Sequence, residues 1–356
     1  MKAEHPEQML PLLQLHGRTV TDTDAKTLYF NWSCAGFTVR FTGKVLRAKL
    51  CAQGHPWVGV SLDGGKTLSP RFECSPNSSW YTLWEAPAEE EHCLRIVKLS
   101  ENAHGKVGLQ ALETDGSLLP PQKEKQGLSI EFVGDSITCG FGNEAPGRDS
   151  PFLTREENAW ITYAAVAARE LNAEFSCVCV SGISVSRGKA SRIPFLSMEE
   201  IYEFADYYYD TLYGRSPRRW DFEKNHSDLV VVSLGTNDVN PIRFAGSLHT
   251  AQEEEAFFLV RYEAFLKTLR RLNGPRTWIC CTLGPLDYYM YDDIEKAVSS
   301  YCAHTGDTRI SCFKLVGVNL LTEGFGAIGH PSAKTHERMG KELSIRLRDI
   351  MNQSLF

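Results

Sequence analysis

Four residues of this sequence stand where their side chains or backbone could take part in one reaction. Ser136 follows an apolar run and a Gly-Asp turn, and Asn237 follows the apolar run 230–234 and a Gly-Thr turn. Gly182 follows a third apolar run, and His330 comes directly before a C-terminal helical pattern. A serine hydroxyl is a weak nucleophile that needs a neighbouring base and hydrogen-bond donors for the developing oxyanion. These residue types indicate nucleophilic hydrolysis of an ester, with the histidine as the base.

Each of these residues alone also has an ordinary structural explanation. A Gly-Asp-Ser sequence is a turn followed by a helix cap, and the residues after 234 form an Asx-rich turn. A lone histidine is more often structural than catalytic, and we expect His336, within the last helix, to be of that kind. The four residues together are more specific, because three of them end successive strands of one predicted sheet.

Five apolar segments, separated by helical patterns, must position these residues. The segments are 128–133, 175–180, 228–234, 277–283 and 309–315. The helical patterns are Ala159 to Leu171, Glu253 to Leu272 and Asp292 to His304, and a final helix is expected to follow Pro331, a residue type that is favourable at the start of a helix. Strands buried on both faces that alternate with helices predict a parallel five-stranded sheet in a three-layer α/β domain. Ligands of such sheets bind beyond the carboxyl ends of the strands.

The first third of the chain has a different pattern. From about Thr19 to Leu112, short alternating segments are separated by turn signals, and Asp63-Gly64-Gly65-Lys66 has the chemistry of a tight hairpin turn. This pattern predicts an all-β sandwich of the jelly-roll type. The stretch 115–123 is polar and rich in proline and glycine, which is typical of an interdomain linker. We therefore expect a β-sandwich domain over residues 1–122 and an α/β hydrolase domain over residues 123–356.

The blocks around the four residues resemble those of the SGNH/GDSL hydrolases. Gly134-Asp135-Ser136, Gly182, Gly235-Thr236-Asn237-Asp238 and His330-Pro331 occur in the order of that family's four sequence blocks. With a β-sandwich before the hydrolase, the chain is similar to carbohydrate esterase family 2 over essentially its whole length. The resemblance implies that Ser136 is the nucleophile and His330 the general base. It also implies an oxyanion hole formed by the backbone N–H groups of Ser136 and Gly182 and the side-chain amide of Asn237.

One position departs from the family pattern. Most relatives have an aspartate three residues before the histidine, where it orients the imidazole, and this sequence has Ala327 there. We therefore expect a Ser136–His330 dyad, in which the second ring nitrogen of His330 donates to a backbone carbonyl or to another side chain. The carboxylates nearest in sequence or expected at the same edge of the sheet are Glu323, Asp287, Asp292 and Asp293.

The resemblance implies an O-acetyl esterase that removes acetyl groups from plant-type polysaccharides or oligosaccharides such as xylan or mannan, through an acyl-enzyme. Two alternatives are a short-chain lipid or thioester hydrolase of the same fold, which no amphipathic lid supports, and an inert sugar-binding protein, which the presence of both Ser136 and His330 disfavours. Tyr288 and Tyr289 follow the fourth strand, where they could stack on sugar rings or pack against the β-sandwich. Ser-His chemistry requires no cofactor, and the sequence has no Cys-x-x-Cys pair or His-Glu-x-x-His motif that would indicate a metal site.

Charge, hydropathy and cysteine content limit the other possibilities. The net charge of −6 is spread over 356 residues without a basic cluster, which disfavours a nucleic-acid partner. No apolar stretch is long enough to span a membrane. The first residues lack the apolar core of a secretory signal, and several of the eleven cysteines lie in predicted strands, as buried free thiols do. Because free thiols suit a reducing compartment, we expect a cytoplasmic protein.

Overall fold

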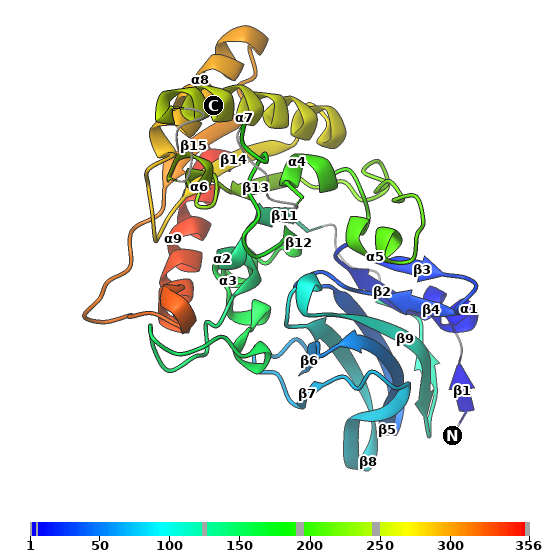
Figure 1. Cartoon of the computed structure of the whole chain (residues 1–356). Helices are drawn as coiled ribbons and strands as arrows, with labels where there is room; N and C mark the ends of the chain where they lie inside the picture. Colours follow the sequence, from blue (N-terminus) through cyan, green and yellow to red (C-terminus); the bar gives the residue numbers. More distant parts are fainter. Residues whose placement is uncertain (1, 5, 123–126, 190–195, 244–249, 353–356) are drawn as a thin grey trace.

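Ten antiparallel strands form the N-terminal part of the chain (Figure 1). The computed structural model describes residues 2–4, 6–122, 127–189, 196–243 and 250–352. The strands are β1 (Lys2–Glu4), β2 (Leu13–His16), β3 (Val20–Asp22), β4 (Thr27–Tyr29), β5 (Gly36–Gly54), β6 (Trp57–Leu62), β7 (Arg71–Glu73), β8 (Ser79–Lys98), β9 (Gly105–Thr114) and β10 (Leu118–Leu119), with the short helix α1 (Pro6–Met9) after β1. Their order is β3-β4-β9-β5-β8-β6-β7, with β1 beside β9 and with β2 and β10 beside β5.

The two longest strands, β5 and β8, hold this sheet together. They span 19 and 20 residues and pair with each other along most of their length. The first part of β5 also pairs with β2, and its second part pairs with β9. Buried and less buried residues alternate along much of β5, so that one side of the strand enters the core. The predicted all-β domain is confirmed, and its strands form one connected sheet because β5 and β8 extend through it.

The predicted tight turn follows β6. Asp63 and Gly64 have φ values of 48° and 75°, the left-handed conformation that a two-residue hairpin turn requires. The N–H of Gly65 donates to the carbonyl of Leu62 over 2.8 Å. The chain then returns as β7, which begins only at Arg71 and pairs antiparallel with β6. The predicted turn at Asp63 and Gly64 is therefore present, but it is part of the longer connection 63–70 and does not join the two strands directly.

Five parallel strands form the second sheet, as predicted, and the structure gives their order as β12-β11-β13-β14-β15. The strands are β11 (Ser129–Gly134), β12 (Glu174–Cys179), β13 (Leu229–Ser233), β14 (Trp278–Leu283) and β15 (Ile310–Lys314). β11 pairs with β12 on one side and with β13 on the other. The carboxyl ends of these three strands are therefore neighbours, and Ser136, Gly182 and Asn237 follow them at one edge of the sheet.

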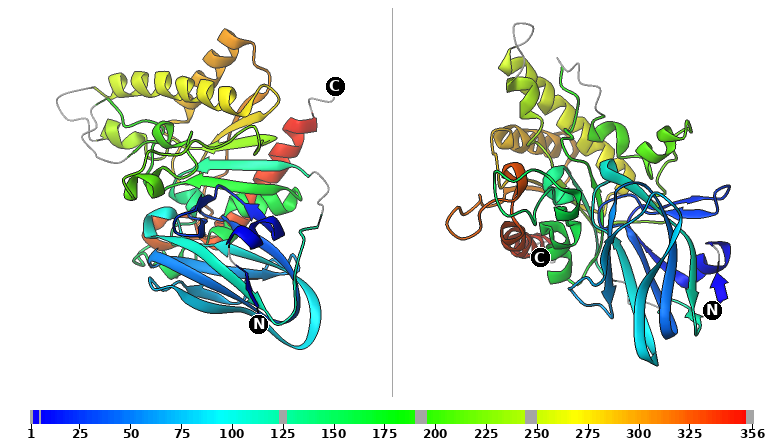
Figure 2. Two further views of the ribbon diagram at one scale, coloured as in Figure 1. Left: turned by 90° about the vertical axis from the view of Figure 1, so that its right-hand side faces the viewer. Right: turned by 60° about the horizontal axis from the view of Figure 1, so that its bottom comes forward.

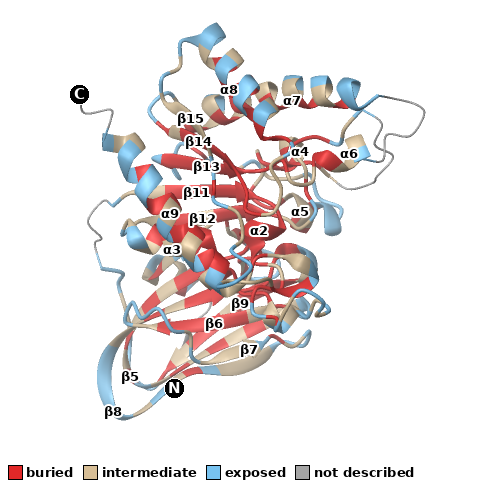
Figure 3. Cartoon of the chain, turned by 90° about the vertical axis from the view of Figure 1, so that its left-hand side faces the viewer, coloured by how far each residue is buried: buried red, intermediate tan, exposed pale blue. Residues whose placement is uncertain are grey.

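Helices cover both faces of this sheet (Figure 3). They are α2 (Ser136–Cys139), α3 (Tyr163–Glu170), α4 (Met198–Ile201), α5 (Tyr207–Leu212), α6 (Val239–Arg243), α7 (Ala251–Asn273), α8 (Tyr291–Thr305) and α9 (Ala333–Asn352). Ile130 and Phe132 of β11 belong to the same buried cluster as residues of α3 and α9. Val133, which alternates with them, belongs to the cluster that contains residues of α7 and α8. The predicted three-layer arrangement is confirmed.

The helical pattern predicted for 159–171 is interrupted near its start. It begins with a 3-10 turn, Ala159–Ile161, and α3 continues after Thr162. α3 packs closely on α9, because Gly340 of α9 has no side chain. A Cβ at Gly340 would lie 2.5 Å from the Cβ of Val166, so this contact excludes larger residues.

The last helix follows Pro331, as predicted. α9 begins at Ala333, so Pro331 itself lies before the helix. Ser332 directly precedes the helix, and its Oγ accepts the N–H of Thr335 over 3.3 Å. A serine side chain at this position can satisfy an N–H group that the first turn leaves without a partner, and a proline side chain cannot.

Buried polar contacts join the two domains. Arg18, which is fully buried before β3, donates to both carboxylate oxygens of Glu131 on β11 over 3.1 Å. Asn31 and Asn102 donate to the carboxylate of Asp206, before α5, over 2.7 and 3.0 Å. These partners offset the cost of burying the charges. In both views of Figure 2 the blue-to-cyan domain lies directly against the green-to-red domain.

The predicted boundary after residue 122 adjoins residues 123–126, which lie outside the described residues. β10 is the last strand of the first sheet and β11 the first strand of the second, but the boundary itself stays a prediction. Among the helices that the structure describes, none combines the length and the apolar character needed to cross a bilayer.

Candidate active site

The sharp turn at the end of β11 places the Ser136 side chain at the carboxyl edge of the sheet. The carboxylate of Asp135 caps α2 by accepting the N–H of Ile137 over 3.0 Å. Gly134 has no space for a side chain, because a Cβ there would lie 1.9 Å from Oγ1 of Thr138. The strand, the cap and the one-turn helix therefore fix the position of Ser136, which is 9% exposed.

A left-handed turn orients His330. Ile328 and Gly329 have φ values of 50° and 72°, a conformation that is unfavourable for a β-branched residue such as Ile328. The carbonyl of Ala327 accepts the backbone N–H of His330 over 3.0 Å and lies 3.2 Å from Nδ1 of the same residue. With Nδ1–H directed at this carbonyl, Nε2 can accept the hydroxyl of Ser136, whose Oγ is 3.0 Å away. The structure thus brings Ser136 and His330 together.

The group that orients His330 is a backbone carbonyl, one of the two possibilities that the sequence left open. The four candidate carboxylates have cationic partners: Glu323 has Arg338, Asp287 has Arg243, Asp293 has Lys296 and Asp292 has Lys314. Within the described part of the chain, the imidazole of His330 is hydrogen-bonded to Ala327 and Ser136. The geometry is that of a Ser-His dyad, in which the Ala327 carbonyl replaces the carboxylate of a triad.

Two backbone N–H groups at this edge have no hydrogen-bond partner in the described part of the chain, those of Ser136 and Gly182. Gly182 has a φ of 79°, and a Cβ there would meet no atom within 4 Å, so the space beside it is open. The N–H of Val180 donates to the carbonyl of Gly134 over 3.3 Å, which holds the segment after β12 beside the Ser136 turn. Both N–H groups can therefore donate to an oxyanion at this edge.

The amide of Asn237 is partly used within the protein. Its Nδ2 donates to the carbonyl of Ile183 over 2.9 Å and lies 3.4 Å from Oδ2 of Asp135. Nδ2 carries two hydrogens, and the longer contact leaves the second of them weakly bound. Asn237 therefore ties the segment after Gly182 to the edge of the sheet and offers one further donor.

Two buried carboxyl groups adjoin these donors. Burial raises the pKa of Asp135 to about 7 and that of Asp238 to about 8. The carboxylate of Asp238 accepts the N–H of Val185 over 2.9 Å, which fixes the end of the Gly182 segment. At pH 7 the Asp135 carboxyl is therefore about half protonated and the Asp238 carboxyl mostly protonated, so together they add less negative charge beside a developing oxyanion than two ionised carboxylates would.

The two histidines of the C-terminal region have different environments. Burial lowers the pKa of His330, while the backbone at Ala327 and the charge of Glu101 act in the opposite direction. His330 is therefore neutral at neutral pH and can accept a proton. His336 is fully buried, accepts the N–H of Tyr163 through Nδ1 over 3.2 Å, and has its pKa lowered to about 3 by burial. These contacts support a structural role for His336, as predicted.

Tyr288 and Tyr289 do not contact the Ser-His pair in the described structure. The hydroxyl of Tyr288 donates to the carbonyl of Leu315 over 2.5 Å. The hydroxyl of Tyr289 donates to Glu255 over 2.7 Å, and this tyrosine is 50% exposed. The structure does not bring the two tyrosines to Ser136, and sugar stacking on them stays a prediction.

Two features of the site were not predicted from the sequence. The ring of Phe141 lies against the imidazole of His330, with 4.4 Å between the centroids. The carboxylate of Glu101, from the N-terminal domain, accepts the N–H of Ser181, the residue before Gly182, over 2.7 Å. Neither residue belongs to a motif. The one available signal was that Glu101 also follows the end of an apolar strand.

Comparisons with known proteins agree with this geometry. Residues 15–121 match the family described as carbohydrate esterase 2 N-terminal. Residues 130–343 match the family described as GDSL-like lipase/acylhydrolase. The two matches correspond to the antiparallel domain and to the α/β domain.

Similar proteins include "Cellulase/esterase CelE" of Acetivibrio thermocellus, which is 29% identical over 89% of this chain. The chain spans only 37% of that relative's length. An "Acetylxylan esterase / glucomannan deacetylase" of Cellvibrio japonicus is 28% identical over 96% of this chain and 90% of its own length. The solved structure of a family two carbohydrate esterase from Clostridium thermocellum in complex with cellohexaose has a TM-score of 0.83 at 27% identity, over 96% of this chain and 99% of that chain. Since the second family match covers more than half of the sequence, the chain belongs to the GDSL-like lipase/acylhydrolase family, with a carbohydrate esterase 2 N-terminal domain before the hydrolase.

Proposed function

We propose that this protein is an O-acetyl esterase that removes acetyl groups from plant-type polysaccharides or oligosaccharides. The observation that carries the proposal is the 3.0 Å contact between Nε2 of His330 and Oγ of Ser136, with the opposite ring nitrogen directed at the Ala327 carbonyl. In this geometry an imidazole can accept the proton of an attacking hydroxyl.

The reaction has two stages. Oγ of Ser136 attacks the acetyl carbonyl carbon while its proton moves to Nε2 of His330, and the oxyanion accepts hydrogen bonds from the N–H groups of Ser136 and Gly182 and from the amide of Asn237. When the intermediate collapses, His330 returns the proton to the departing sugar hydroxyl, and acetyl-Ser136 is left. Water, deprotonated by His330, then attacks this ester, so that acetate leaves and the Ser136 hydroxyl is restored.

The relatives support a carbohydrate substrate. The similar protein of Cellvibrio japonicus is named an acetylxylan esterase / glucomannan deacetylase, and the similar structure from Clostridium thermocellum is of a complex with cellohexaose. We therefore propose acetylated xylan or glucomannan, or oligosaccharides derived from them, as the substrate class.

The acyl-chain preference tests this proposal. We expect kcat/KM for acetyl esters to exceed that for octanoyl esters by at least about tenfold, because the segments beside Ser136 present polar groups such as Ser181 and Asn237 that do not cover a long alkyl chain. The measurements are hydrolysis of 4-nitrophenyl esters of increasing chain length and acetate release from acetylated xylan and glucomannan. A rate that rises with chain length would identify a lipid or thioester hydrolase. Sugar binding without any acetate release would identify an inert binding protein.

Replacing Asn237 with alanine should lower kcat by about 100-fold with little change in KM, since an oxyanion donor acts mainly in the transition state. Asn225→Ala is a matched control, because Asn225 is exposed at the opposite, amino end of β13. Steady-state kinetics on an acetyl ester gives both constants. If KM alone rose, Asn237 would bind the substrate rather than the oxyanion.

We further infer that the protein works in a reducing compartment such as the cytoplasm. All eleven cysteines lie within the described residues as free thiols, and seven of them are buried. Free buried thiols support a compartment in which disulfides do not persist. Detection of the native protein in the medium rather than in the cells would contradict this inference.

A further inference from the structure

Glu101 lies just after β8, where the N-terminal domain meets the active-site edge of the second sheet. Its side chain is 1% exposed. Oε2 accepts the N–H of Ser181 over 2.7 Å and lies 3.6 Å from Sγ of Cys139, on the one-turn helix that begins with Ser136. One buried carboxylate of the other domain therefore contacts both the Gly182 segment and the helix of the nucleophile.

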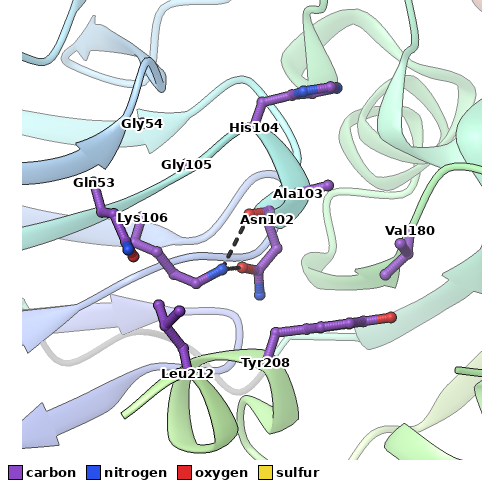
Figure 4. Close-up of a pocket in the computed structure, with 10 residues that line it drawn as sticks. All are labelled: Gln53, Gly54, Asn102, Ala103, His104, Gly105, Lys106, Val180, Tyr208 and Leu212. Carbon is purple, nitrogen blue, oxygen red and sulfur yellow. Dashed lines mark hydrogen bonds between the residues drawn. The ribbon is translucent and has the colours of Figure 1, made fainter. Parts of the chain in front are cut away.

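The Gly182 segment has open space on one side. A pocket of about 360 Å³ lies between the turn 102–106 of the N-terminal domain and a wall that includes Val180 and Tyr208 (Figure 4). Gly182 itself has no neighbour where a side chain would point. Packing alone therefore does not hold residues 180–182, and the hydrogen bond from the Ser181 N–H to Glu101 restrains them together with that from the Val180 N–H to Gly134.

Glu101 is the charged member of a pair of buried carboxyl groups. Oε2 of Glu157 accepts the backbone N–H of Glu101 over 2.9 Å, and the Glu157 side chain is fully buried. Burial raises the pKa of Glu101, but the nearby imidazole of His104 and the hydrogen bond from Ser181 outweigh it, so the pKa lies below its usual value. Burial and the charge of Glu101 raise the pKa of Glu157 well above its usual value. Near neutral pH Glu101 is therefore ionised, and Glu157 is the carboxyl of the pair that holds a proton more readily.

A buried cation balances this pair. The ammonium of Lys98 donates to the carbonyls of Ser100 and Glu101 over 2.5 and 2.9 Å, and burial lowers its pKa to about 8. Nε2 of His104 is 3.3 Å from Oε1 of Glu101 and 4.0 Å from Oε2 of Glu157. These three residues offer ligand atoms within 4.8 Å of one another, as a metal site would. Because Lys98 already supplies a cation beside them, we interpret the cluster as a charge-balanced network.

A row of stacked rings extends from this cluster to His330. His104 stacks on Phe152 with 4.7 Å between centroids, Phe152 stacks on Phe141 at 4.1 Å, and Phe141 lies against His330 at 4.4 Å. Rings in contact displace water, so a charge at Glu101 is screened less than it would be across solvent.

Few other charges act on His330. The charge of Glu101 acts to raise its pKa, against the larger effect of burial. His336 stays neutral, because burial lowers its pKa to about 3. Arg148, whose carbonyl accepts the N–H of Gly329, has its guanidinium over the ring of Phe325. Glu101 is thus the carboxylate whose charge acts on the His330 imidazole, which has Ala327 where most relatives have an aspartate.

We propose that Glu101 is a positioning residue of the esterase: it holds the segment that carries Gly182, and its charge stabilises the protonated form of His330. This inference rests on the proposed function and adds to it. The N-terminal domain thereby contributes directly to catalysis, through a residue that touches neither the substrate nor the reacting atoms.

Two substitutions of the same kind at neighbouring carboxyls test the charge. Glu101→Gln keeps an oxygen that can accept the Ser181 N–H and removes the negative charge. We expect kcat to be about tenfold lower and KM to be unchanged. In the pH profile of kcat/KM, the acid limb should move to lower pH, because the His330 imidazolium loses its stabilising charge. Glu157→Gln makes the same exchange at the neighbouring carboxyl, which is not among the charges that act on His330, and should leave kcat and the acid limb as in the wild type.

Two further variants separate position from charge. Glu101→Ala removes both the charge and the acceptor, and we expect kcat to fall about 100-fold. Glu101→Asp keeps the charge on a shorter side chain, so that kcat falls while the acid limb stays in place. The aspartate variant also serves if Glu101→Gln does not fold, as circular dichroism would show. A Glu101→Asp enzyme with wild-type kcat would overturn the positioning role.

An NMR titration of the His330 Cε1–H in wild type and Glu101→Gln provides a readout that needs no turnover. A lower titration midpoint in the variant supports the inference, and an identical midpoint overturns it. If the wild type releases acetate and Glu101→Gln matches it in kcat and in acid limb, the inference fails while the proposed function stands. If the wild type hydrolyses no acetyl ester, the proposed function fails, and the NMR titration still decides whether Glu101 acts on His330.

Discussion

Replacement of Ser136 by alanine is expected to lower kcat for acetate release by about 10⁶-fold, because the hydroxyl is the attacking group of the first proposed stage and carries the acetyl group into the second. The oxyanion donors are unchanged in this variant, so a rate about 10³-fold above that in water should persist. The substitution removes the hydrogen bond between Ser136 and His330, but the Ala327 carbonyl still holds His330. The fold should therefore be preserved. Acetate release at high enzyme concentration measures the residual rate, and thermal unfolding followed by circular dichroism confirms that the variant is folded.

Ser311→Ala is the matched control for this substitution. Ser311 lies on β15, at the edge of the same sheet, and its Oγ contacts Sγ of Cys280 rather than the active site. The control should retain wild-type kcat. Activity of a folded Ser136→Ala protein within tenfold of the wild type would remove Ser136 from the mechanism.

The second large effect is expected at His330. His330→Ala should lower kcat by at least about 10⁴-fold, because no other base lies within hydrogen-bond distance of Oγ of Ser136 in the described structure. In the wild type the base must be neutral, and burial lowers the pKa of His330 from its ordinary value of 6.5. The acid limb of kcat/KM should therefore lie below pH 6.5, with activity lost as the pH falls through it.

A pH–rate profile of the wild type and single-turnover kinetics of the variant measure these two effects. His304→Ala, at the exposed end of α8, is the control and should leave both the rate and the acid limb unchanged. An acid limb well above pH 6.5, or a His330→Ala enzyme within tenfold of the wild type, would require a different base.

The sequence was sufficient to predict the elements that meet at the site. Ser136, Gly182 and Asn237 each follow an apolar strand, and parallel strands bring their carboxyl ends to one edge whatever the details of packing. His330 precedes a strongly patterned helix, so its place on a loop was also predictable. These predictions depend on the hydrophobic periodicity and on the order of the elements along the chain. Neither changes when the predicted end of a strand is wrong by a residue or two.

The group that orients His330 could not be chosen from the sequence. An alanine at position 327 rules out a carboxylate there, but the role of its carbonyl depends on the left-handed turn at Ile328 and Gly329. Isoleucine is one of the residues least suited to that conformation, so local propensity argues against the turn that forms. The position of Glu101 was likewise not predictable from the sequence, because only the tertiary structure brings this carboxylate of the first domain to the end of β12.

The buried contacts between the two domains determine whether either domain can be transferred alone into a longer protein. If the α/β domain were expressed alone, Glu131 would lose its partner Arg18, and Asp206 would lose the amides of Asn31 and Asn102. A hydrolase domain separated in this way would expose Glu131 without its cationic partner and Asp206 with fewer donors, and it would lack the Glu101 contact to Ser181. In protein engineering the two domains should therefore be transferred together as one unit. A linker to another domain should be attached before the first of them or after the second.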